Sequence, residues 1–132
     1  MTIDYDTTHE RVDLAQLAEL YRSVGWNDRA SEPERIAEAV RNSLWIVTAW
    51  ESGKLVGFCR AFSDGAFTAY VGDVLVNPTH QGRGVGRELV RRLMADRDRI
   101  AFVLKAAPPV QPFYAKLGFA PAPDMFRRPR SH

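Results

Sequence analysis

Apolar side chains recur every three or four positions in two stretches of the first third of the chain, which is the spacing of an amphipathic helix. In the first stretch they are Leu14, Leu17, Ala18 and Tyr21. Asp13 stands three residues before Gln16, the spacing of a capping box, and Gly25 follows as a stop signal. These signals predict a helix that begins after Asp13, preceded by a short strand over residues 2–5.

The second stretch carries apolar residues at Ile36, Ala37 and Val40. Ser31 and Glu34 repeat the capping spacing, and Pro33 between them suits the first turn of a helix. The pattern therefore predicts a second capped helix that ends at about residue 42.

The middle of the chain is rich in β-branched and aromatic residues. Residues 44–50 and 55–62 read as strands, and the polar, glycine-containing segment 51–54 between them predicts a hairpin. A further strand is predicted over residues 68–76, where Asn77-Pro78 ends it. Gly72 inside this last strand indicates a bulge.

The last third alternates between the two kinds of element. Helical spacing predicts a helix over residues 85–95, and residues 100–104 form a short apolar strand. A short helix should end at Gly118, and residues 119–128 leave room for one or two terminal strands. The order β-α-α-β-β-β-α-β-α-β predicts an α+β fold with a mixed sheet, in a single domain over residues 1–132.

Composition narrows the function classes. The chain is 45% hydrophobic and 26% charged, and no apolar run approaches the roughly 18 residues that span a bilayer, so no membrane partner is expected. Residues 1–64 carry a net charge of −4 and residues 65–132 a net charge of +6. The basic half suits a polyanionic ligand, but its arginines are not interleaved with aromatics, so nucleic acid is not expected.

The start of the chain, the single cysteine and the histidines give no sign of export, of a disulfide or of a metal site. The acidic start Met-Thr-Ile-Asp-Tyr-Asp lacks a signal peptide's pattern, so a cytoplasmic location is expected. Cys59 is the sole cysteine and lies in an apolar run, which excludes an internal disulfide and favours a buried thiol. No second thiol or clustered histidine suggests a metal site, and His80 is expected at the surface.

The segment Gln81-Gly82-Arg83-Gly84-Val85-Gly86 connects a strand directly to a helix. Free backbone N–H groups and the helix dipole make such a junction an anion site, and glycine lets a phosphate approach the main chain. Arg87 after Gly86 excludes a P-loop, which needs Lys-Ser/Thr there, and the missing glycine at position 87 excludes the dinucleotide GxGxxG pattern. A glycine-rich turn that only packs a helix on a strand is the alternative.

Two motifs in this order resemble the GNAT superfamily of N-acetyltransferases. Gln81-x-x-Gly84-x-Gly86 matches its Gln/Arg-x-x-Gly-x-Gly/Ala signature, and residues 113–119, Phe-Tyr-Ala-Lys-Leu-Gly-Phe, look like its C-terminal helix end. Residues 21–26 and 42–45 further resemble small bacterial members and their plant serotonin N-acetyltransferase-like relatives. The resemblance implies a mostly antiparallel mixed sheet with helices on both faces and an enzyme that uses acetyl-coenzyme A without a metal.

The same resemblance implies the cofactor contacts. The strand edge would pair with pantetheine amides, and the loop amides would hold the pyrophosphate; these residues are Val74, Leu75, Val76, Gln81, Gly82, Arg83, Gly84, Val85, Gly86 and Arg87. A backbone N–H near Leu75 or Val76 would polarise the thioester carbonyl. Arg83, Arg87 and Arg91 are candidates for the outer phosphates, or are solvated helix-surface charges. Residues 105–109 lack the asparagine often found after the family's fifth strand.

Two side chains are candidates for catalysis. Attack on a thioester needs a neutral amine, and Asp73 interrupts an apolar strand, so it is a candidate base that acts directly, through water, or by holding the ammonium group. The alternative is an aspartate satisfied by neighbouring amides or an arginine. By resemblance Tyr114 protonates the departing thiolate, and the alternative is a packing tyrosine or a cofactor hydrogen bond.

The predicted function is transfer of an acetyl group from acetyl-coenzyme A to a primary amine by direct attack, since no nucleophile with an adjacent base is evident. A non-catalytic acyl-coenzyme A sensor of the same fold is the alternative, and an interaction domain with a glycine turn is a third possibility. The acceptor is a small-molecule or peptide amine, and a homodimer is possible. Four aromatic residues either line an acceptor pocket or belong to the core: Trp26, Trp45, Phe67 and Tyr70.

Overall fold

The computed structural model describes residues 2–131 and contains one five-stranded sheet with the strand order β1-β2-β3-β4-β5. The strands are β1 (Asp4–Asp6), β2 (Trp45–Glu51), β3 (Lys54–Ser63), β4 (Thr68–Val76) and β5 (Ala101–Leu104). Neighbouring strands are antiparallel except β4 and β5, which are parallel. The α+β class and the mixed, mostly antiparallel sheet are therefore confirmed.

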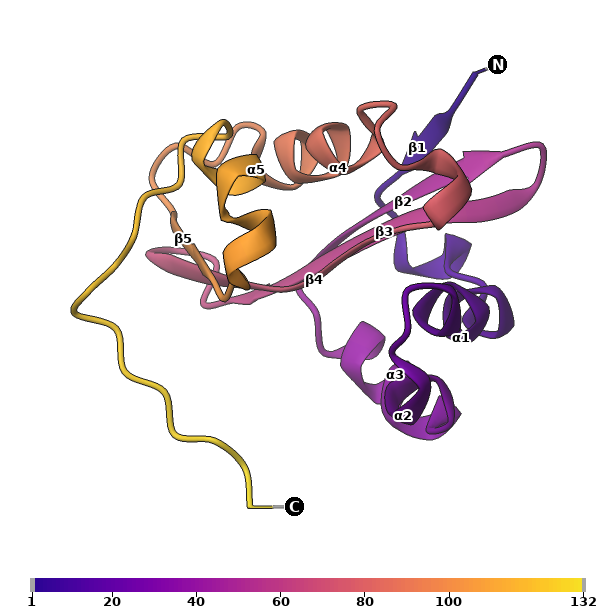
Figure 1. Cartoon of the computed structure of the whole chain (residues 1–132), viewed down its shortest axis with the longest axis horizontal. Helices are drawn as coiled ribbons and strands as arrows, with labels where there is room; N and C mark the ends of the chain where they lie inside the picture. The colour runs from indigo at the N-terminus through magenta and orange to yellow at the C-terminus, as the bar shows by residue number, and fades with distance from the viewer. Residues whose placement is uncertain (1, 132) are drawn as a thin grey trace.

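Helices cover both faces of the sheet, as Figure 1 shows. The first face carries α1 (Leu14–Ser23), α2 (Asn27–Ala30) and α3 (Pro33–Arg41), and the second face carries α4 (Val85–Met94) and α5 (Gln111–Ala115). Three 3-10 turns complete the described elements, at His9–Arg11, Pro78–His80 and Pro108–Val110.

The sheet separates two hydrophobic clusters. The cluster under α1–α3 is built around Phe58 and Leu17, and the cluster under α4 around Leu89 and Leu93, all of them fully buried. Alternate residues of a strand point to opposite faces, so β3 supplies both clusters at once. Cys59 belongs to the second cluster and is fully buried, as its apolar neighbours predicted.

A bulge at Gly72 sets which side chains of β4 reach each face. The register of β4 against β3 shifts there, and Gly72 has no partner of its own. Val71 and Val74 consequently both face α4, whereas Asp73 and Leu75 face the opposite side, where α1 lies. The bulge that the sequence predicted is confirmed, and it turns the Asp73 carboxyl away from α4 and α5.

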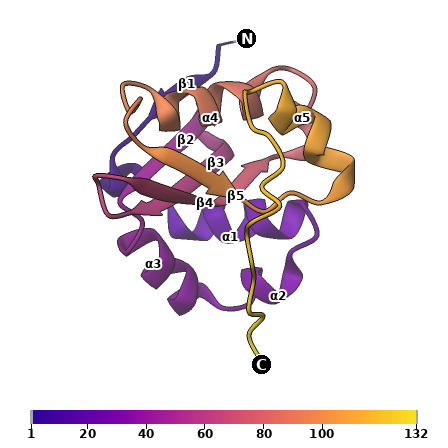
Figure 2. The ribbon, with the colours of Figure 1, turned by 90° about the vertical axis from the view of Figure 1, so that its left-hand side faces the viewer.

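Strands β4 and β5 stay together over four residue pairs only, from Thr68 with Ala101 to Val71 with Leu104. After Leu104 the chain leaves the sheet and turns into α5, as Figure 2 shows, while β4 continues to Val76. Within the described residues, the edge of β4 over residues 72–76 has no strand partner on the β5 side.

Of the two helix caps that the sequence predicted, one is confirmed and one is wrong. Asp13 caps α1 as expected, because its Oδ1 accepts a hydrogen bond from the Gln16 N–H at 3.1 Å. The predicted Ser31 cap is wrong: the short helix α2 ends at Ser31, whose hydroxyl donates to the Asp28 carbonyl, and α3 begins after Glu32. Pro33 does occupy the first turn of α3.

The predicted terminal strand is also wrong, since no described residue after α5 lies in a strand. Pro121, Pro123 and Pro129 have no N–H to donate, so this segment cannot sustain a hydrogen-bond ladder. The tail instead runs away from β5 and leaves that strand at the edge of the sheet (Figure 1).

The two clusters should behave as independent stabilising units. We expect Leu17→Ala and Leu89→Ala each to lower the free energy of unfolding by about 2–5 kcal/mol through the cavity that each leaves. Because the sheet lies between the two sites, the double variant should equal the sum of the single ones within about 0.5 kcal/mol. Urea unfolding measures this, and a larger coupling would show that the two clusters are not independent.

Candidate functional site

The glycine loop joins the end of β4 to the start of α4. The Asn77 N–H bonds to the Val56 carbonyl at 2.8 Å, and the Asn77 side chain accepts a hydrogen bond from the Thr79 N–H. Gly82 and Gly84 then take positive φ angles of 78° and 82°, a conformation that favours glycine. No other heavy atom lies within 4 Å of where a Cβ would sit at either glycine, so this side of the loop is open.

The first turn of α4 presents free backbone donors to this open side. The first bond at this end of the helix runs from the Glu88 N–H to the Gly84 carbonyl at 3.1 Å. The N–H groups of Val85, Gly86 and Arg87 therefore have no acceptor inside the helix, and Gly84 offers no capping side chain. Together with the helix dipole, these groups are suited to bind an anion, and the anion site at this loop remains a prediction of the sequence.

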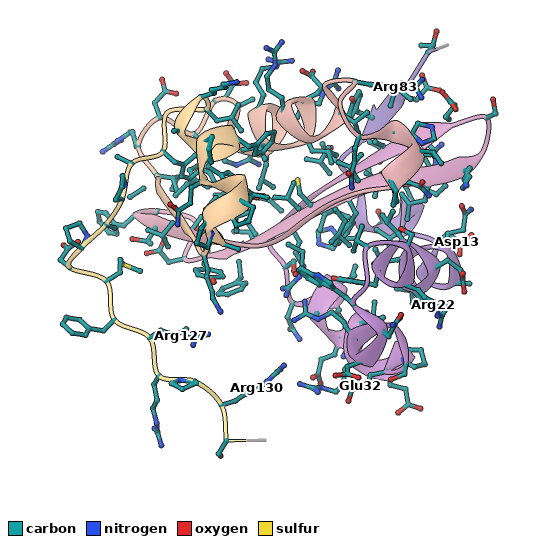
Figure 3. The ribbon with its side chains drawn as sticks, viewed as in Figure 1. Asp13, Arg22, Glu32, Arg83, Arg127 and Arg130 are labelled. Carbon is teal, nitrogen blue, oxygen red and sulfur yellow. The ribbon has the colours of Figure 1, made fainter. Side chains whose placement is uncertain are left out.

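His80 anchors the loop to the β2–β3 hairpin. The sequence predicted this side chain at the surface, but it is buried, with 6% of it exposed. Its Nε2 lies 3.0 Å from Oε1 of Glu51 at the end of β2, and its Nδ1 lies 2.8 Å from the Thr79 hydroxyl. The expectation failed because the β2–β3 hairpin, distant in sequence, folds against the loop. The Arg83 side chain extends from the loop toward this hairpin (Figure 3), with Nη2 3.7 Å from Glu51.

The cations on α4 are not equally available to a ligand. Glu88 accepts hydrogen bonds from Arg91 and Arg92, and the Arg91 bonds above all lower the Glu88 pKa to about 2. Arg91 is thus already neutralised by a neighbour. Arg87 is exposed and forms no ion pair within residues 2–131, which leaves it and the partly exposed Arg83 nearest to the open loop.

Two hydrogen bonds fix how the backbone of β4 is oriented at its free edge. The Asn77 N–H points to β3, and the Val76 carbonyl accepts from the Gln81 side chain at 3.0 Å rather than from a strand. Because successive residues of a strand direct their N–H groups to opposite sides, the N–H groups of Val74 and Val76 point to the open edge. Leu75 between them points its backbone to β3.

Gly86 connects the loop to α5. A Cβ at position 86 would lie 3.3 Å from Phe113 Cζ and 3.5 Å from a methyl of Val76, so the missing side chain lets Phe113 pack onto the start of α4. The Phe113 and Tyr114 rings meet edge to face at 4.9 Å, and Tyr114 meets Phe119 in the same way at 5.8 Å. The two sequence motifs are therefore one packed unit.

Tyr114 lines a cavity of 610 Å³ between β5, α5 and the start of the tail, together with Phe102 and Leu104. Burial, with a smaller contribution from Cys59, raises the pKa of the Tyr114 hydroxyl to about 12. No hydrogen bond to another described residue perturbs it. At neutral pH this group is a protonated phenol that can donate a proton or a hydrogen bond.

Asp73 lies on the other face of the sheet and is 3% exposed. Its Oδ2 accepts hydrogen bonds from the Tyr21 hydroxyl at 2.5 Å and from Arg60 Nε at 2.6 Å, and its Oδ1 accepts from Arg29 Nη1 at 2.8 Å. Burial first and Asp73 second raise the pKa of Tyr21, so the phenol stays protonated and donates. Of the two sequence readings, this geometry favours an aspartate satisfied by arginines.

The aromatic residues that were left open divide between the two faces. Trp45 packs on Phe102 near α4, whereas Trp26 stacks on Tyr21 at 5.8 Å beside Asp73. Tyr70 stacks on Phe62 at 5.2 Å on β3 and β4. Phe67 is 75% exposed and belongs to neither core cluster.

The bonds at Asp73 should matter to stability. We expect Asp73→Asn to lower the free energy of unfolding by about 3 kcal/mol, at the low end for breaking a buried ion pair because Arg29 is partly exposed. Asp98→Asn, at an exposed aspartate without an ion pair in the described chain, should change it by less than about 0.5 kcal/mol. Urea unfolding compares the two, and equal values would contradict a structural role for Asp73.

Two further properties concern metal ions and membranes. Among the described residues, no group of three His, Cys, Asp or Glu side chains is placed to hold a metal ion. No helix in the described part of the chain has the length and apolar character needed to cross a membrane.

Sequence comparisons give relatives along nearly the whole chain. The profile of the acetyltransferase (GNAT) family matches residues 11–119. The uncharacterized N-acetyltransferase ycf52 of Pyropia yezoensis is 36% identical over 137 residues, which cover 96% of this chain and 78% of that protein. Serotonin N-acetyltransferase 2, chloroplastic, of Oryza sativa subsp. japonica is 39% identical over 123 residues, which cover 88% of this chain but only 60% of the rice protein.

Solved structures agree with the sequence relatives. A GNAT family acetyltransferase from Streptococcus pneumoniae TIGR4 superposes with a TM-score of 0.78 at 25% identity, covering 98% of this chain and 100% of the other. A protein from Deinococcus radiodurans R1 superposes with a TM-score of 0.80 at 31% identity, covering 96% and 87%. The chain therefore belongs to the acetyltransferase (GNAT) family and is an N-acetyltransferase that uses acetyl-coenzyme A.

Proposed function

We propose that this enzyme transfers the acetyl group to a primary amine by direct attack of the amine on the thioester, with Tyr114 as the general acid. The contact between Gly86 and Phe113 carries the proposal, because it holds the Tyr114 phenol beside the helix that offers the anion site. Acetyl-coenzyme A supplies the activated acyl group, and the remaining steps depend on residues of this chain.

The free donors of the loop and the open strand edge suit the two polar parts of the donor molecule. The pyrophosphate would bind at the N–H groups of Val85, Gly86 and Arg87, with Arg83 within reach of its outer oxygens. The wider loop Gln81–Arg87 would surround it. The pyrophosphate contacts that the sequence predicted are therefore proposed again, with the three backbone N–H groups at the start of α4 as the hydrogen-bond donors.

Along β4, the proposed contacts are the N–H groups of Val74 and Val76. They point to the open edge, whereas Leu75, which the sequence grouped with them, uses its backbone in the β3 ladder. An N–H fixed in a strand needs no reorganisation to stabilise the oxyanion that develops on a thioester carbonyl, and such a donor contributes about 3–4 kcal/mol. No side-chain substitution removes it.

The proton for the departing thiolate comes from Tyr114 in this proposal. Its hydroxyl is protonated at neutral pH and has no competing hydrogen-bond partner among the described residues. Burial that disfavours the phenolate disfavours a thiolate at the same place, so both pKa values rise together and the transfer stays feasible.

Asp73 has an indirect role in this proposal, as a positioning residue. Both of its oxygens already accept hydrogen bonds from cationic donors, Arg60 and Arg29, which leaves it poorly suited to take a proton from an amine. Asp73 instead holds Arg29 and Arg60 in place on the face of the sheet that carries α1.

Tyr114→Phe tests the general acid. We expect the maximal rate to fall by about 10²-fold or more, with little change in affinity for acetyl-coenzyme A, because one proton donor is lost. Release of the coenzyme A thiol measures turnover with a panel of amines. Tyr5→Phe, on β1 beside Arg92 and in neither sequence motif, is the matched control and should keep the rate. An unchanged rate in Tyr114→Phe would remove the role.

Gly84→Val tests the loop. A β-branched residue resists the φ of 82° at this position, so the loop should deform and binding of acetyl-coenzyme A should be lost in calorimetry. Gly53→Val is the matched control, since Gly53 has a φ of 79° and equally open surroundings in the β2–β3 turn. A folded Gly84→Val protein that still binds would show that the anion site lies elsewhere.

A sensor that binds acyl-coenzyme A without turnover was the alternative from the sequence, and the thiol-release assay separates it from the enzyme. A sensor would bind in calorimetry but release no thiol with any amine. The cytoplasmic location likewise remains a prediction, and the rice relative is named as chloroplastic.

A further inference from the structure

The face of the sheet that carries Asp73 holds two cations around one anion. Arg29 comes from α2 and Arg60 from β3, and both bind the Asp73 carboxylate. Tyr21, the third partner, is a neutral phenol that donates its proton. The group therefore carries a net charge of +1, because one of the two guanidinium charges has no carboxylate of its own.

Arg60 is fully engaged inside the fold. Its Nε donates to Asp73, its Nη1 lies 3.5 Å from the Ser43 hydroxyl, and its side chain is 13% exposed. The guanidinium also lies flat on the backbone at Gly72, where a Cβ would come within 2.8 Å of Cζ. The excess charge is therefore available to a ligand through Arg29 rather than through Arg60.

Arg29 is fixed and still accessible. Its Nη1 bonds to Asp73, and its guanidinium lies 5.3 Å from the Trp26 ring and 5.5 Å from the Tyr21 ring. The side chain is 36% exposed, and besides Asp73 its other hydrogen-bonding neighbour in the described chain is the Tyr21 side chain. A guanidinium carries five N–H donors in a rigid plane, so a pre-positioned pair remains for an outside oxyanion.

The position of this arginine relates it to the proposed reaction. Asp73, which holds Arg29, directly follows the Gly72 bulge, and β4 loses its β5 partner after Val71. The Val74 N–H, which points to the open edge, comes one residue later. A molecule that approaches the thioester from this face therefore meets Arg29 and the stacked pair of the exposed Phe62 and the half-buried Tyr70.

Acidic and basic side chains both lie near Arg29. Asp28, Glu32 and Glu38 line a small hollow with Arg29 between α2 and α3, and Glu32 is paired with Arg35. Arg130 of the tail lines the same hollow and extends toward Glu32 (Figure 3). Without Arg29 the hollow holds three acids and two cations, which offsets the excess charge, so binding of an anion depends on the exposed N–H donors of Arg29.

We propose that Arg29 binds an anionic group, a carboxylate or a phosphate, on the amine acceptor, so that the enzyme prefers zwitterionic amines to polyamines and lysine-rich peptides. This inference rests on the proposed acetyl transfer. A bidentate pair between Arg29 and the anionic group would hold the amine toward β4. Polyamines and lysine side chains carry no anionic group and gain no contact at Arg29. The rice relative is named for serotonin, an amine without a carboxylate, so the inference does not follow from that name.

Matched acceptors test this on the wild-type enzyme. Phenylalanine and phenethylamine differ by one carboxylate, and we expect kcat/KM to be at least tenfold higher for phenylalanine. β-Alanine, O-phosphoethanolamine and ethanolamine share a two-carbon chain, so they distinguish a carboxylate site from a phosphate site. Putrescine should be the poorest acceptor. A higher kcat/KM for phenethylamine or putrescine than for every anionic amine would overturn the inference.

Arg29→Gln tests the residue. We expect KM for the preferred anionic acceptor to rise by about 10- to 100-fold, as for loss of a charged hydrogen bond, while KM for phenethylamine changes less than about threefold. Arg35→Gln, which removes an exposed arginine one helix away, should change neither value. Arg29→Lys keeps the charge and should restore part of the affinity even if Arg29→Gln is destabilised. An equal loss for anionic and neutral acceptors in both variants would contradict recognition by Arg29.

The outcomes separate the two proposals. Binding of acetyl-coenzyme A in calorimetry without thiol release for any amine would remove both the proposed transfer and this inference. Turnover without a preference for anionic amines would leave the transfer standing and remove the role of Arg29 alone.

Discussion

Strand β4 pairs with β5 over four residues only, and the unpaired remainder of β4 determines where every functional group of the molecule lies. Beyond Val71 the strand keeps β3 on one side and exposes its other edge. The glycine loop continues from the end of that edge, and α5 packs back onto the loop through Phe113 and Gly86. A peptide edge left open inside a sheet is a binding surface, because its N–H groups are already oriented and lack partners.

The bulge at Gly72 in the same strand determines on which face of the sheet each side chain lies. One extra residue reverses which side chains face α4, so Asp73 lies with Arg29 and Arg60 while Tyr114 lies on the opposite face. Donor and acceptor chemistry can therefore be assigned to different sides of one sheet. The proposed transfer takes place where the two sides meet, at the edge that β5 leaves free.

Asp73 illustrates how far residue type alone can be interpreted. A carboxylate in an apolar strand must be either functional or paired, and the sequence left both readings open. Its partners come from residues 13 to 52 positions away in the chain, so no local spacing could have identified them.

The predicted terminal strand over residues 119–128 was wrong for a different reason. The prolines of this segment are visible in the sequence, and each one removes an N–H donor that a strand would need for pairing.

The sequence by itself determined most of the elements and predicted the part of the site that binds the acetyl donor. Helical spacing, the Asp13 cap, the Gly72 bulge and the glycine loop are local features, whose conformations depend on residues a few positions apart. Only the tertiary structure decided that His80 is buried, that Leu75 faces β3 while Val76 faces the open edge, and that Arg29 stays available beside Asp73. These depend on which distant segments meet, and burial, pairing and charge balance have no value until the chain has folded.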